Sequence, residues 1–283
     1  MSKLTLFSPA KVNLFLRVKK KRKDGYHEIS SIIHQINLYD EIYMELSQDP
    51  SIKVCGEGKV ICGEKNLCYK AADAILKYTK KKIGVSIFIK KRIPVSSGLG
   101  GGSSNAAMTL IGLNKLLNLR LNKRQLMKIG QTLGADVPFF IFSKTALASG
   151  IGTNLIPFYI KPILWFVLIY PNIEISTKWT YESLKLNLTN SDKNIKLPPS
   201  INKIEELSTI LYNDLEKVVL SFYPQIKRIK NQLLELGAIG SLMSGSGSTV
   251  FGLFSTEKDA YFAYQQILSL SDSNYSVFIA RSL

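Results

Sequence analysis

The residues of this chain best suited to chemistry lie in a stretch rich in glycine and serine, Pro94–Ala107, which reads Pro-Val-Ser-Ser-Gly-Leu-Gly-Gly-Gly-Ser-Ser-Asn-Ala-Ala. Glycine adopts positive φ angles readily and lets the backbone approach a ligand, because it has no Cβ. Ser103 and Ser104 are residue types favoured at a helix N-cap and first turn. A helix begins with N–H groups and the positive end of its dipole, which together attract an anion. The stretch therefore predicts a phosphate-binding loop.

Ordered elements are expected on both sides of this loop. Val85–Ile93 alternates apolar and polar residues as a half-buried strand does, and apolar residues recur at helical spacing from Ala106 to Leu117. A flexible Gly/Ser linker would suit the composition, but it would not need a strand and a helix to flank it. The loop is neither a Walker A sequence, since no Gly-Lys-Ser/Thr closes it, nor a dinucleotide fingerprint, since Ser103 stands in place of the third glycine.

Lys11 and Asp136 are the candidates for the chemistry itself. Strand periodicity places Lys11 and Asn13 on the face opposite Val12 and the apolar residues that follow it. Lys11 could equally be a strand lysine that points to water. Asp136 either caps a helix or forms an Asx turn before Pro138, or it faces the loop as a carboxylate. A lysine and an aspartate beside a phosphate loop are what phosphoryl transfer requires.

Two further segments could contact a ligand. Tyr26 and His27 follow the hairpin signal Asp24-Gly25, where they could stack on a ring or simply pack the hairpin. The turn Ser244-Gly-Ser-Gly-Ser248 could line another wall of a cleft with its backbone amides, or it could be an ordinary hairpin.

Composition indicates a globular protein. The 283 residues, 46% of them hydrophobic, suffice for about two domains, which we expect at residues 1–159 and 160–283. The longest apolar run, Ile163–Tyr170, is too short to span a bilayer and predicts a buried strand. Since the chain opens with strand-like sequence rather than a signal peptide, we expect it in the cytoplasm. We expect neither a membrane nor a nucleic-acid partner, and a monomer or weak homodimer.

Charge and cysteine content leave the partner open. The net charge of +16 suits either a nucleic-acid partner or the steering of a small anionic substrate, although lysine runs such as Lys19–Lys23 are usually solvated. Cys55, Cys62 and Cys68 lack the paired spacing of a zinc site and are expected to be reduced thiols.

The remaining sequence predicts an α+β protein. We expect a strand or strand pair at residues 4–18, strands at 29–36 and 41–46, a helix at 67–80, and a helix capped by Asn122 that ends near Leu133. In the second half we expect a strand at 164–170, a surface loop at 187–199, and helices at 201–211 and 224–236. Strands at 240–243 and 249–254, a helix at 257–268 capped by Thr256, and a last strand at 277–280 complete a sandwich with helices on one face.

Four segments together resemble one family, the galactokinase, homoserine kinase, mevalonate kinase and phosphomevalonate kinase (GHMP) superfamily. They are Pro9-Ala-Lys-Val-Asn-Leu-Phe-Leu16, Asp24-Gly-Tyr-His27, the loop Pro94–Ala107 and Gly134-Ala-Asp-Val-Pro138. The first two point to the members that act on a cytidine diphosphate conjugate of methylerythritol. The resemblance implies a two-domain GHMP kinase fold, with an N-terminal domain like ribosomal protein S5 domain 2 and a ferredoxin-like C-terminal domain.

The resemblance also implies an activity and roles for individual residues. The reaction would be ATP-dependent, magnesium-assisted phosphorylation of the C2 hydroxyl of the substrate, in the non-mevalonate route to isoprenoids. Asp136 would take or orient the hydroxyl proton, and Lys11 would lower the pKa of the hydroxyl and hold the carboxylate. The substrate-contacting positions would be Asn13, Tyr26, His27, Thr177 and Tyr181, with Tyr181 where the family has phenylalanine. The ATP-contacting positions would be Asn66, Lys91, Pro94, Val95, Ser96, Ser97, Gly98, Leu99, Gly100, Gly101, Gly102, Ser103 and Ser104.

Two rival functions make different demands on the sequence. A homoserine or mevalonate kinase would keep the glycine loop without needing Tyr26 and His27 to read cytosine. A basic RNA-binding protein would need exposed aromatics among basic residues, and would not need Lys11 or Asp136. The protein ligands of magnesium are not indicated, with Ser104 the single candidate.

Overall fold

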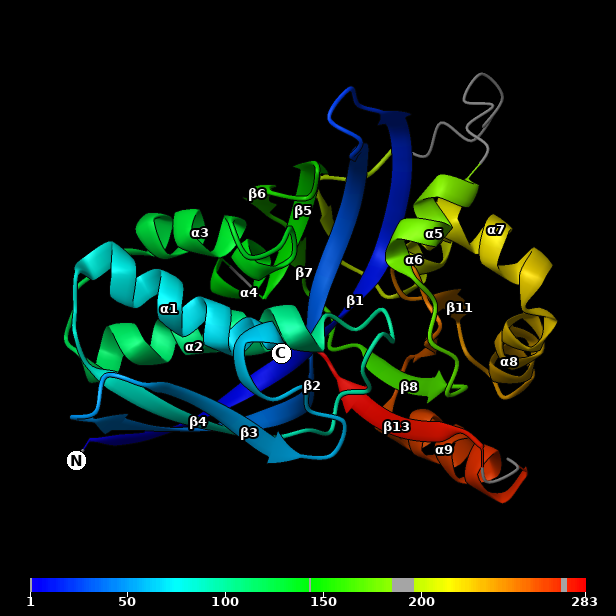
Figure 1. The fold of residues 1–283 in the computed structure, drawn as a ribbon. Helices are drawn as coiled ribbons and strands as arrows, with labels where there is room; N and C mark the ends of the chain where they lie inside the picture. The colour runs from blue at the N-terminus through cyan, green and yellow to red at the C-terminus, as the bar shows by residue number, and fades with distance from the viewer. Residues whose placement is uncertain (1, 143, 185–195, 271–273) are drawn as a thin grey trace. The chain divides into compact units, whose positions relative to one another are not determined.

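The computed structural model describes residues 2–142, 144–184, 196–270 and 274–283 (Figure 1). The chain forms two compact units, each of several segments. Unit 1 contains Met1–Ala10, Leu38–Val95 and Gly100–Lys144, and unit 2 contains Lys11–Asn37, Ser96–Leu99 and Thr145–Leu283. The division into domains at residues 1–159 and 160–283 stays a prediction.

Two long strands run through both units. Strand β1 (Lys3–Lys21) confirms the expected first strand, and Gly25 at φ 86° makes the turn that follows it. Strand β2 (His27–Ser47) is continuous, so the prediction of two strands, at 29–36 and 41–46, was wrong. The even-numbered side chains Ile36, Leu38, Asp40 and Ile42 are all buried, so the alternation continues across the segment between the two predicted strands. The acid at an inward position hid this continuity, because it interrupts the apolar pattern.

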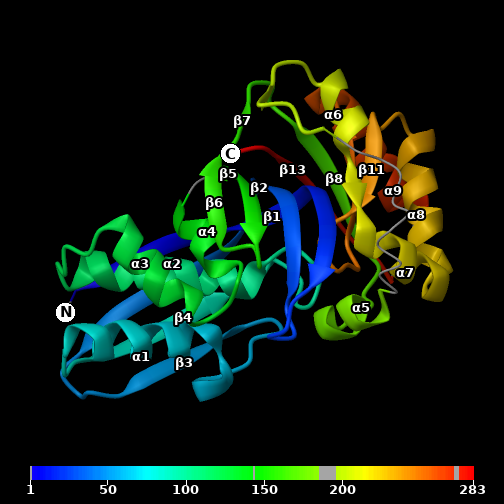
Figure 2. The same ribbon diagram turned by 90° about the horizontal axis from the view of Figure 1, so that it is seen from above.

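In unit 1, helices pack on one side of a small sheet (Figure 2). Strand β4 (Gly84–Lys90) pairs antiparallel with residues 41–47 of β2 and parallel with β3 (Ile52–Glu57). Helix α1 (Leu67–Thr79), preceded by the short η1 (Gly63–Lys65), and α2 (Gly101–Leu116) lie together, followed by α3 (Lys123–Gln131) and α4 (Val137–Phe142). Asn122 caps α3 in a capping box with Gln125, which confirms that expectation.

In unit 2, an antiparallel sheet of order β11-β12-β8-β13 carries helices on one face, as expected. Its strands are β8 (Trp165–Tyr170), β11 (Gly240–Met243), β12 (Val250–Phe254) and β13 (Ser276–Arg281). The packed helices are α8 (Pro224–Glu235) and α9 (Glu257–Leu270), and Thr256 accepts a hydrogen bond from the N–H of Asp259 at the start of α9. Val167 and Ile169 of β8 share one buried cluster with Ile229 and Ala263 of these helices.

Shorter elements complete unit 2. They are β5 (Thr145–Gly150), β6 (Asn154–Pro157), β7 (Tyr159–Ile160), α5 (Thr177–Ser183), β9 (Ser200–Ile201), α6 (Glu205–Ile210), β10 (Tyr212–Asn213) and α7 (Asp214–Phe222). The helix expected at 201–211 is shortened to α6, and α7 was not predicted. Much of the loop expected at 187–199 lies outside the described residues. Among the residues described, no helix has the length and apolar character needed to cross a membrane.

Candidate active site

Strand β1 buries Lys11 within unit 2. The side chain is 4% exposed, and its Nζ donates to Oδ1 of Asn13 at 2.5 Å. Asn13 in turn donates through Nδ2 to Oγ of Ser31 at 2.9 Å, and Ser31 donates to the carbonyl of Phe15. A buried ammonium group requires such polar partners, because its desolvation is unfavourable. The alternative that Lys11 points to water was therefore wrong.

The serine turn Ser244–Ser248 lies against this lysine. A Cβ built on Gly245 would be 3.2 Å from both Nζ of Lys11 and Oδ1 of Asn13. The hydroxyl of Ser244 donates to the carbonyl of Gly98 at 3.0 Å, and the N–H of Lys11 donates to the carbonyl of Leu99 at 2.9 Å. The structure thus joins β1, the middle of the glycine loop and the serine turn around one buried ammonium group.

Within the glycine loop, a side chain at Gly98 would produce the most severe steric clash. Its φ is +81°, and a Cβ at this position would lie 2.1 Å from the carbonyl oxygen of Ser244. Both the left-handed backbone and the close approach of another main chain require glycine.

Sequence reasoning missed Asn213 and Glu216, whose side chains hydrogen-bond to the main chain of the serine turn and of Met243 directly before it. Asn213 donates through Nδ2 to the carbonyls of Met243 and Gly245, both at 2.8 Å. Glu216 accepts from the N–H of Met243 at 2.8 Å and pairs with Lys230 at 2.6 Å. The available signal was local: Asn213 also caps α7 by accepting from the N–H of Leu215, and asparagine is a preferred N-cap.

The structure brings together some of the residues predicted to contact substrate. The rings of His27 and Tyr181 are 5.1 Å apart between centroids, and Oγ1 of Thr177 is 2.9 Å from Oγ of Ser246 in the serine turn. Tyr26 is 59% exposed, so its ring is available to a ligand. Burial, with a smaller effect from the positive charge of Lys21, lowers the pKa of His27, which favours the neutral ring at neutral pH.

Helix α2 begins in unit 1 at the end of the glycine loop. Its N-cap is Gly100 in the left-handed conformation (φ 71°), so of the N-cap and first turn expected for Ser103 and Ser104 the N-cap was wrong, whereas the first-turn placement is confirmed for Ser103. The positive φ of glycine lets the helix start earlier, and Ser103 lies in its first turn. Ser104 is fully buried and accepts from the hydroxyl of Ser8 at 2.7 Å. The N–H groups of a first helical turn have no carbonyl one turn back, so this turn can bind an anion.

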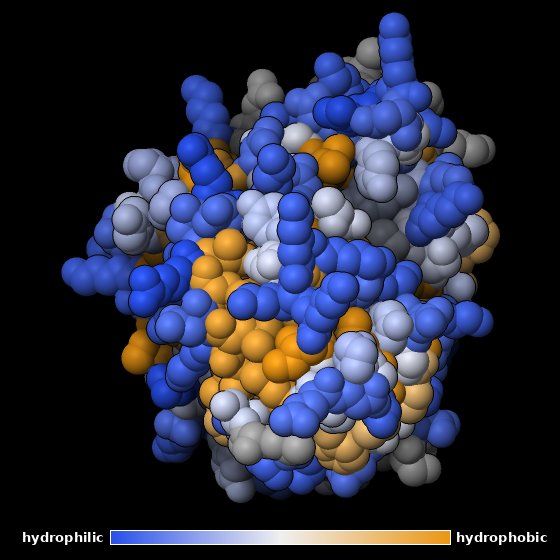
Figure 3. All heavy atoms as spheres, turned by 60° about the vertical axis from the view of Figure 1, so that its left-hand side comes forward, coloured by the Kyte–Doolittle hydropathy of each residue, from blue (hydrophilic) through white to orange (hydrophobic). Residues whose placement is uncertain are grey.

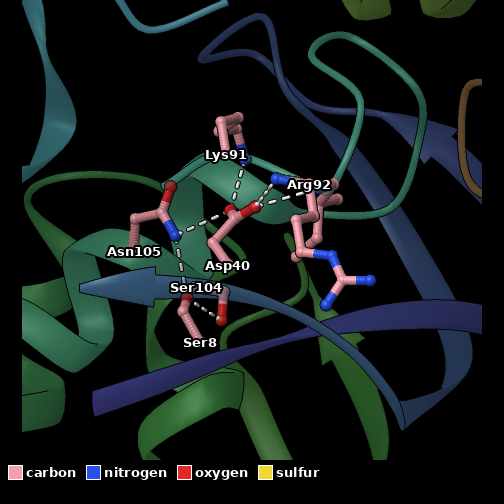
Figure 4. A network of polar contacts seen from close by, with 7 residues as sticks. Ser8, Asp40, Lys91, Arg92, Ser104 and Asn105 are labelled. Carbon is pink, nitrogen blue, oxygen red and sulfur yellow. Dashed lines mark hydrogen bonds and ion pairs between the residues drawn. The ribbon is translucent and has the colours of Figure 1, made fainter. Parts of the chain in front are cut away.

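A lysine outside the loop supplies positive charge at this helix end. Lys91 follows β4, and its ammonium lies 2.8 Å from where a Cβ of Gly101 would stand. Its side chain is 10% exposed and forms an ion pair with the fully buried Asp40 (Figure 4). Sequence reasoning missed Asp40, although an acid among the inward-facing residues of β2 was a usable signal.

Two predicted residues have positions that leave their roles untested. Asp136 is partly buried directly before α4, a place compatible both with a helix cap and with a site carboxylate. Asn66 caps α1 by accepting from the N–H of Cys68 at 2.8 Å and donates to the carbonyl of Ile61 at 2.6 Å. The predicted contact of Asn66 with adenine stays a prediction.

The part of the chain that the structure describes holds no group of three or more His, Cys, Asp or Glu side chains placed to bind a metal ion. The three cysteines are free thiols, and burial raises the pKa of Cys68 to about 12. A magnesium ion bound chiefly by phosphates and water is compatible with this set of side chains, because Mg²⁺ commonly keeps several waters.

Comparison with known proteins agrees with these features. Residues 66–144 match the GHMP kinases N terminal domain, and residues 194–270 match the GHMP kinases C terminal domain. The 4-diphosphocytidyl-2-C-methyl-D-erythritol kinase of Citrifermentans bemidjiense is 50% identical over 94% of this chain and 95% of its own length. The protein of the same name from Geobacter sulfurreducens is 48% identical over 96% and 97%.

Solved structures give the same result. A crystal structure of 4-(cytidine 5'-diphospho)-2C-methyl-D-erythritol kinase has a TM-score of 0.79 and 31% identity, and the match covers 99% of this chain and all of the other. A crystal structure of L. major mevalonate kinase has a TM-score of 0.75 at 16% identity, over 99% of this chain and 97% of the other, which shows a shared fold alone. The predicted two-domain GHMP kinase fold is confirmed. This chain belongs to the GHMP kinases and, among them, to the family of the 4-diphosphocytidyl-2-C-methyl-D-erythritol kinases.

Proposed function

We propose that this chain transfers the γ-phosphoryl group of ATP to the C2 hydroxyl of 4-diphosphocytidyl-2-C-methyl-D-erythritol, giving the 2-phosphate and ADP. The names of the relatives support this substrate. The structural observation that carries the proposal is the buried ammonium of Lys11, held by Asn13 against the serine turn and the glycine loop. A buried cation beside a loop that suits phosphate can stabilise the charge that develops in phosphoryl transfer.

In this reaction Asp136 accepts or orients the proton of the C2 hydroxyl, whose oxygen forms the new bond to the γ-phosphorus. The bond from that phosphorus to the β,γ-bridging oxygen breaks, and ADP leaves with the electron pair. Lys11 lowers the pKa of the attacking hydroxyl by placing positive charge beside it. Thr177 and Asn13 orient the substrate, Tyr26 and Tyr181 flank the cytosine, and neutral His27 hydrogen-bonds to it.

On the nucleotide side, the loop 94–104 and Lys91 bind the phosphates, and Asn66 lies near the adenine. Magnesium, when bound, neutralises charge on the β- and γ-phosphates. Since the hydroxyl of Ser104 is buried and already bonded to Ser8, the phosphates and water are the main ligands in this proposal. We further propose a cytoplasmic enzyme, monomeric or weakly dimeric, with domains at 1–159 and 160–283.

The test is ADP release from ATP and magnesium with the cytidine substrate, run beside homoserine, mevalonate and RNA. The wild type is compared with Asp136→Asn and with Asp73→Asn, an exposed carboxylate of α1 paired with Lys77 at 2.8 Å. The expected result is turnover with the cytidine substrate alone, lost in Asp136→Asn and kept in Asp73→Asn. Turnover with another acceptor would overturn the roles of Tyr26 and His27. Full activity of Asp136→Asn would overturn its role in the reaction.

A further inference from the structure

We propose that Asp40 is a positioning residue for the phosphates of ATP, acting through Lys91 and through both ends of the glycine loop. The inference rests on the proposed ATP site and adds a residue that the reaction scheme above does not contain. Asp40 touches no reacting atom in this scheme, and it works by fixing the groups that do bind phosphate.

The first observation is that Asp40 is saturated with hydrogen bonds (Figure 4). It is fully buried, and its Oδ1 accepts from the N–H groups of Arg92 and Ile93, both at 2.8 Å. Its Oδ2 accepts from Nδ2 of Asn105 at 2.9 Å and from the ammonium of Lys91. An ionised carboxylate has about four lone-pair sites, so these four donors occupy its whole capacity. Asp40 therefore fixes the positions of these four donors and is not a candidate for proton transfer.

The second observation is where those donors lie in the chain. Arg92 and Ile93 directly precede Pro94, and Asn105 lies in α2, directly after the proposed phosphate-binding residues 94–104. One carboxylate on β2 thus holds the two ends of the phosphate loop together. Fixing both ends lowers the conformational entropy that the loop must lose when it closes on a ligand.

The third observation is the position of the Lys91 ammonium. It stands at Gly101, the first residue of α2, where the positive end of the helix dipole also lies. An ammonium group is unfavourable at a helix N-terminus, and the negative charge of Asp40 offsets this repulsion. Asp40 can therefore hold positive charge at the one end of α2 that would bind phosphate, in a chain whose glycine loop contains no lysine.

The hydrogen-bond network around Asp40 also includes Ser8 of β1, which bonds to two residues in the first turns of α2. Nδ2 of Asn105 donates to Oγ of Ser8 at 2.9 Å, and Ser8 donates to Oγ of Ser104 at 2.7 Å. In Asp40→Asn the new amide group has one oxygen and one NH₂, so its NH₂ must face either the backbone donors or Lys91 and Asn105. That variant keeps the volume of the side chain and disrupts the positioning.

The experiment compares the wild type with Asp40→Asn, Lys91→Met and the double variant, using steady-state kinetics and calorimetric titration with ATP and with adenosine. We expect Asp40→Asn to raise KM for ATP by about tenfold or more, while KM for the cytidine substrate changes less than about twofold. Binding of adenosine should be unchanged, because the effect is on the phosphates. The double variant should be less impaired than the sum of the two single effects, since Asp40 acts in part through that lysine and in part through the ends of the loop.

The matched control is Asp214→Asn in unit 2. Asp214 is another buried carboxylate, which accepts from the N–H of Val18 at 2.8 Å and from the hydroxyl of Tyr212. We expect this variant to lower the melting temperature without a selective rise in KM for ATP. An equal weakening of both substrates by Asp40→Asn, or a loss of melting temperature alone, would overturn the positioning role while leaving the proposed function intact. If the wild type does not turn over the cytidine substrate, the proposed function fails, and the ATP and adenosine titrations still test Asp40.

Discussion

At the scale of single residues, the site depends on charged and polar groups that are buried and yet fully engaged. Lys11 is bonded to Asn13, and Asp40 is bonded to Lys91 and three further donors. In a low-dielectric interior such groups are strongly oriented when they are satisfied, and unfavourable when a partner is lost. The same principle identifies His34, a buried side chain that no proposed catalytic step uses.

The first prediction concerns Gly98. Gly98→Ala places a Cβ against the carbonyl of Ser244 in a backbone of positive φ. We expect a loss of about 1–3 kcal/mol in the free energy of unfolding, together with a higher KM for ATP. The control is Gly102→Ala, whose Cβ would meet Leu67 at an ordinary 3.5 Å. Urea unfolding of both variants and kinetics of Gly98→Ala test this prediction, and an equal loss of stability in the two variants would contradict the packing of the serine turn on the loop.

The second prediction concerns pH. His34 is fully enclosed, its Nδ1 is 2.7 Å from Oγ1 of Thr145, and its Nε2 has no hydrogen-bond partner in the described part of the chain. Burial lowers the pKa of His34 from 6.5 to about 4. The unfolded chain therefore takes up the proton first as pH falls, so stability is full above pH 6.5 and declines towards pH 4. By linkage, the loss in the free energy of unfolding is about 2 kcal/mol at pH 5 and reaches about 3 kcal/mol at pH values below the lowered pKa.

The measurement is urea unfolding of the wild type and of His34→Gln at pH 7.5 and pH 5. Glutamine keeps a hydrogen-bonding group near Thr145 and does not titrate in this range. The difference in stability between the two proteins should shift in favour of His34→Gln at pH 5. A constant difference at both pH values would show that His34 is not the group responsible.

At the scale of elements, short segments from distant parts of the chain hold the two loops of the site. β10 pairs with residues 15 and 16 of β1, and Asn213 at the end of β10 reaches the serine turn and also caps α7. β4 leads into the glycine loop, and α2 follows from it. Each loop is therefore an extension of regular structure, which limits the conformations that it can adopt.

The third prediction separates these two roles of Asn213. Asn213→Ala removes a helix cap and two hydrogen bonds to the serine turn, so we expect a loss of about 2–3 kcal/mol in stability. We also expect turnover to fall by about tenfold, because the turn lies against Lys11. Asn122→Ala, which removes only the cap of α3, should lose about 1 kcal/mol and keep its turnover. If both variants keep full activity, the serine turn does not help to position the reacting groups.

At the scale of the whole molecule, the main property is the charge of +16. Several basic residues form exposed ion pairs, such as Lys3 with Glu45 and Lys178 with Glu182. Figure 3 shows one face on which hydrophilic side chains surround a patch of hydrophobic ones. Individual surface pairs contribute little to stability. We expect the excess of positive charge to act on the approach of ligands, because both proposed substrates carry phosphates.

The fourth prediction follows from this charge. We expect kcat/KM for ATP and for the cytidine substrate to fall roughly threefold to tenfold between about 50 mM and about 500 mM salt, since screening weakens long-range attraction. The value of kcat should change much less, because the bound substrates are already in place. Steady-state kinetics in potassium chloride, with sucrose as an uncharged control, measure this. Equal effects of salt and sucrose would rule out electrostatic steering.

The sequence by itself determined the features that depend on local pattern. The glycine-rich loop between a strand and a helix, the turn at Gly25, the cap at Asn122 and the strand face shared by Lys11 and Asn13 are all present in the structure. These features follow from backbone sterics, strand periodicity and capping, which act between residues close in the chain. The resemblance of four segments then led to the family that the comparisons confirmed.

The tertiary structure alone decided the contacts between segments far apart in the chain. Asp40 meets Lys91 and Asn105 across 51 and 65 positions, and Ser244 meets Gly98 across 146. No periodicity or local propensity encodes such pairings, because they arise from how the sheets and helices pack. For the same reason, the sequence predicted two strands where the structure has the single strand β2, because the inward-facing Asp40 interrupts the apolar pattern. In the folded protein that acid is the residue that holds the glycine loop at both ends.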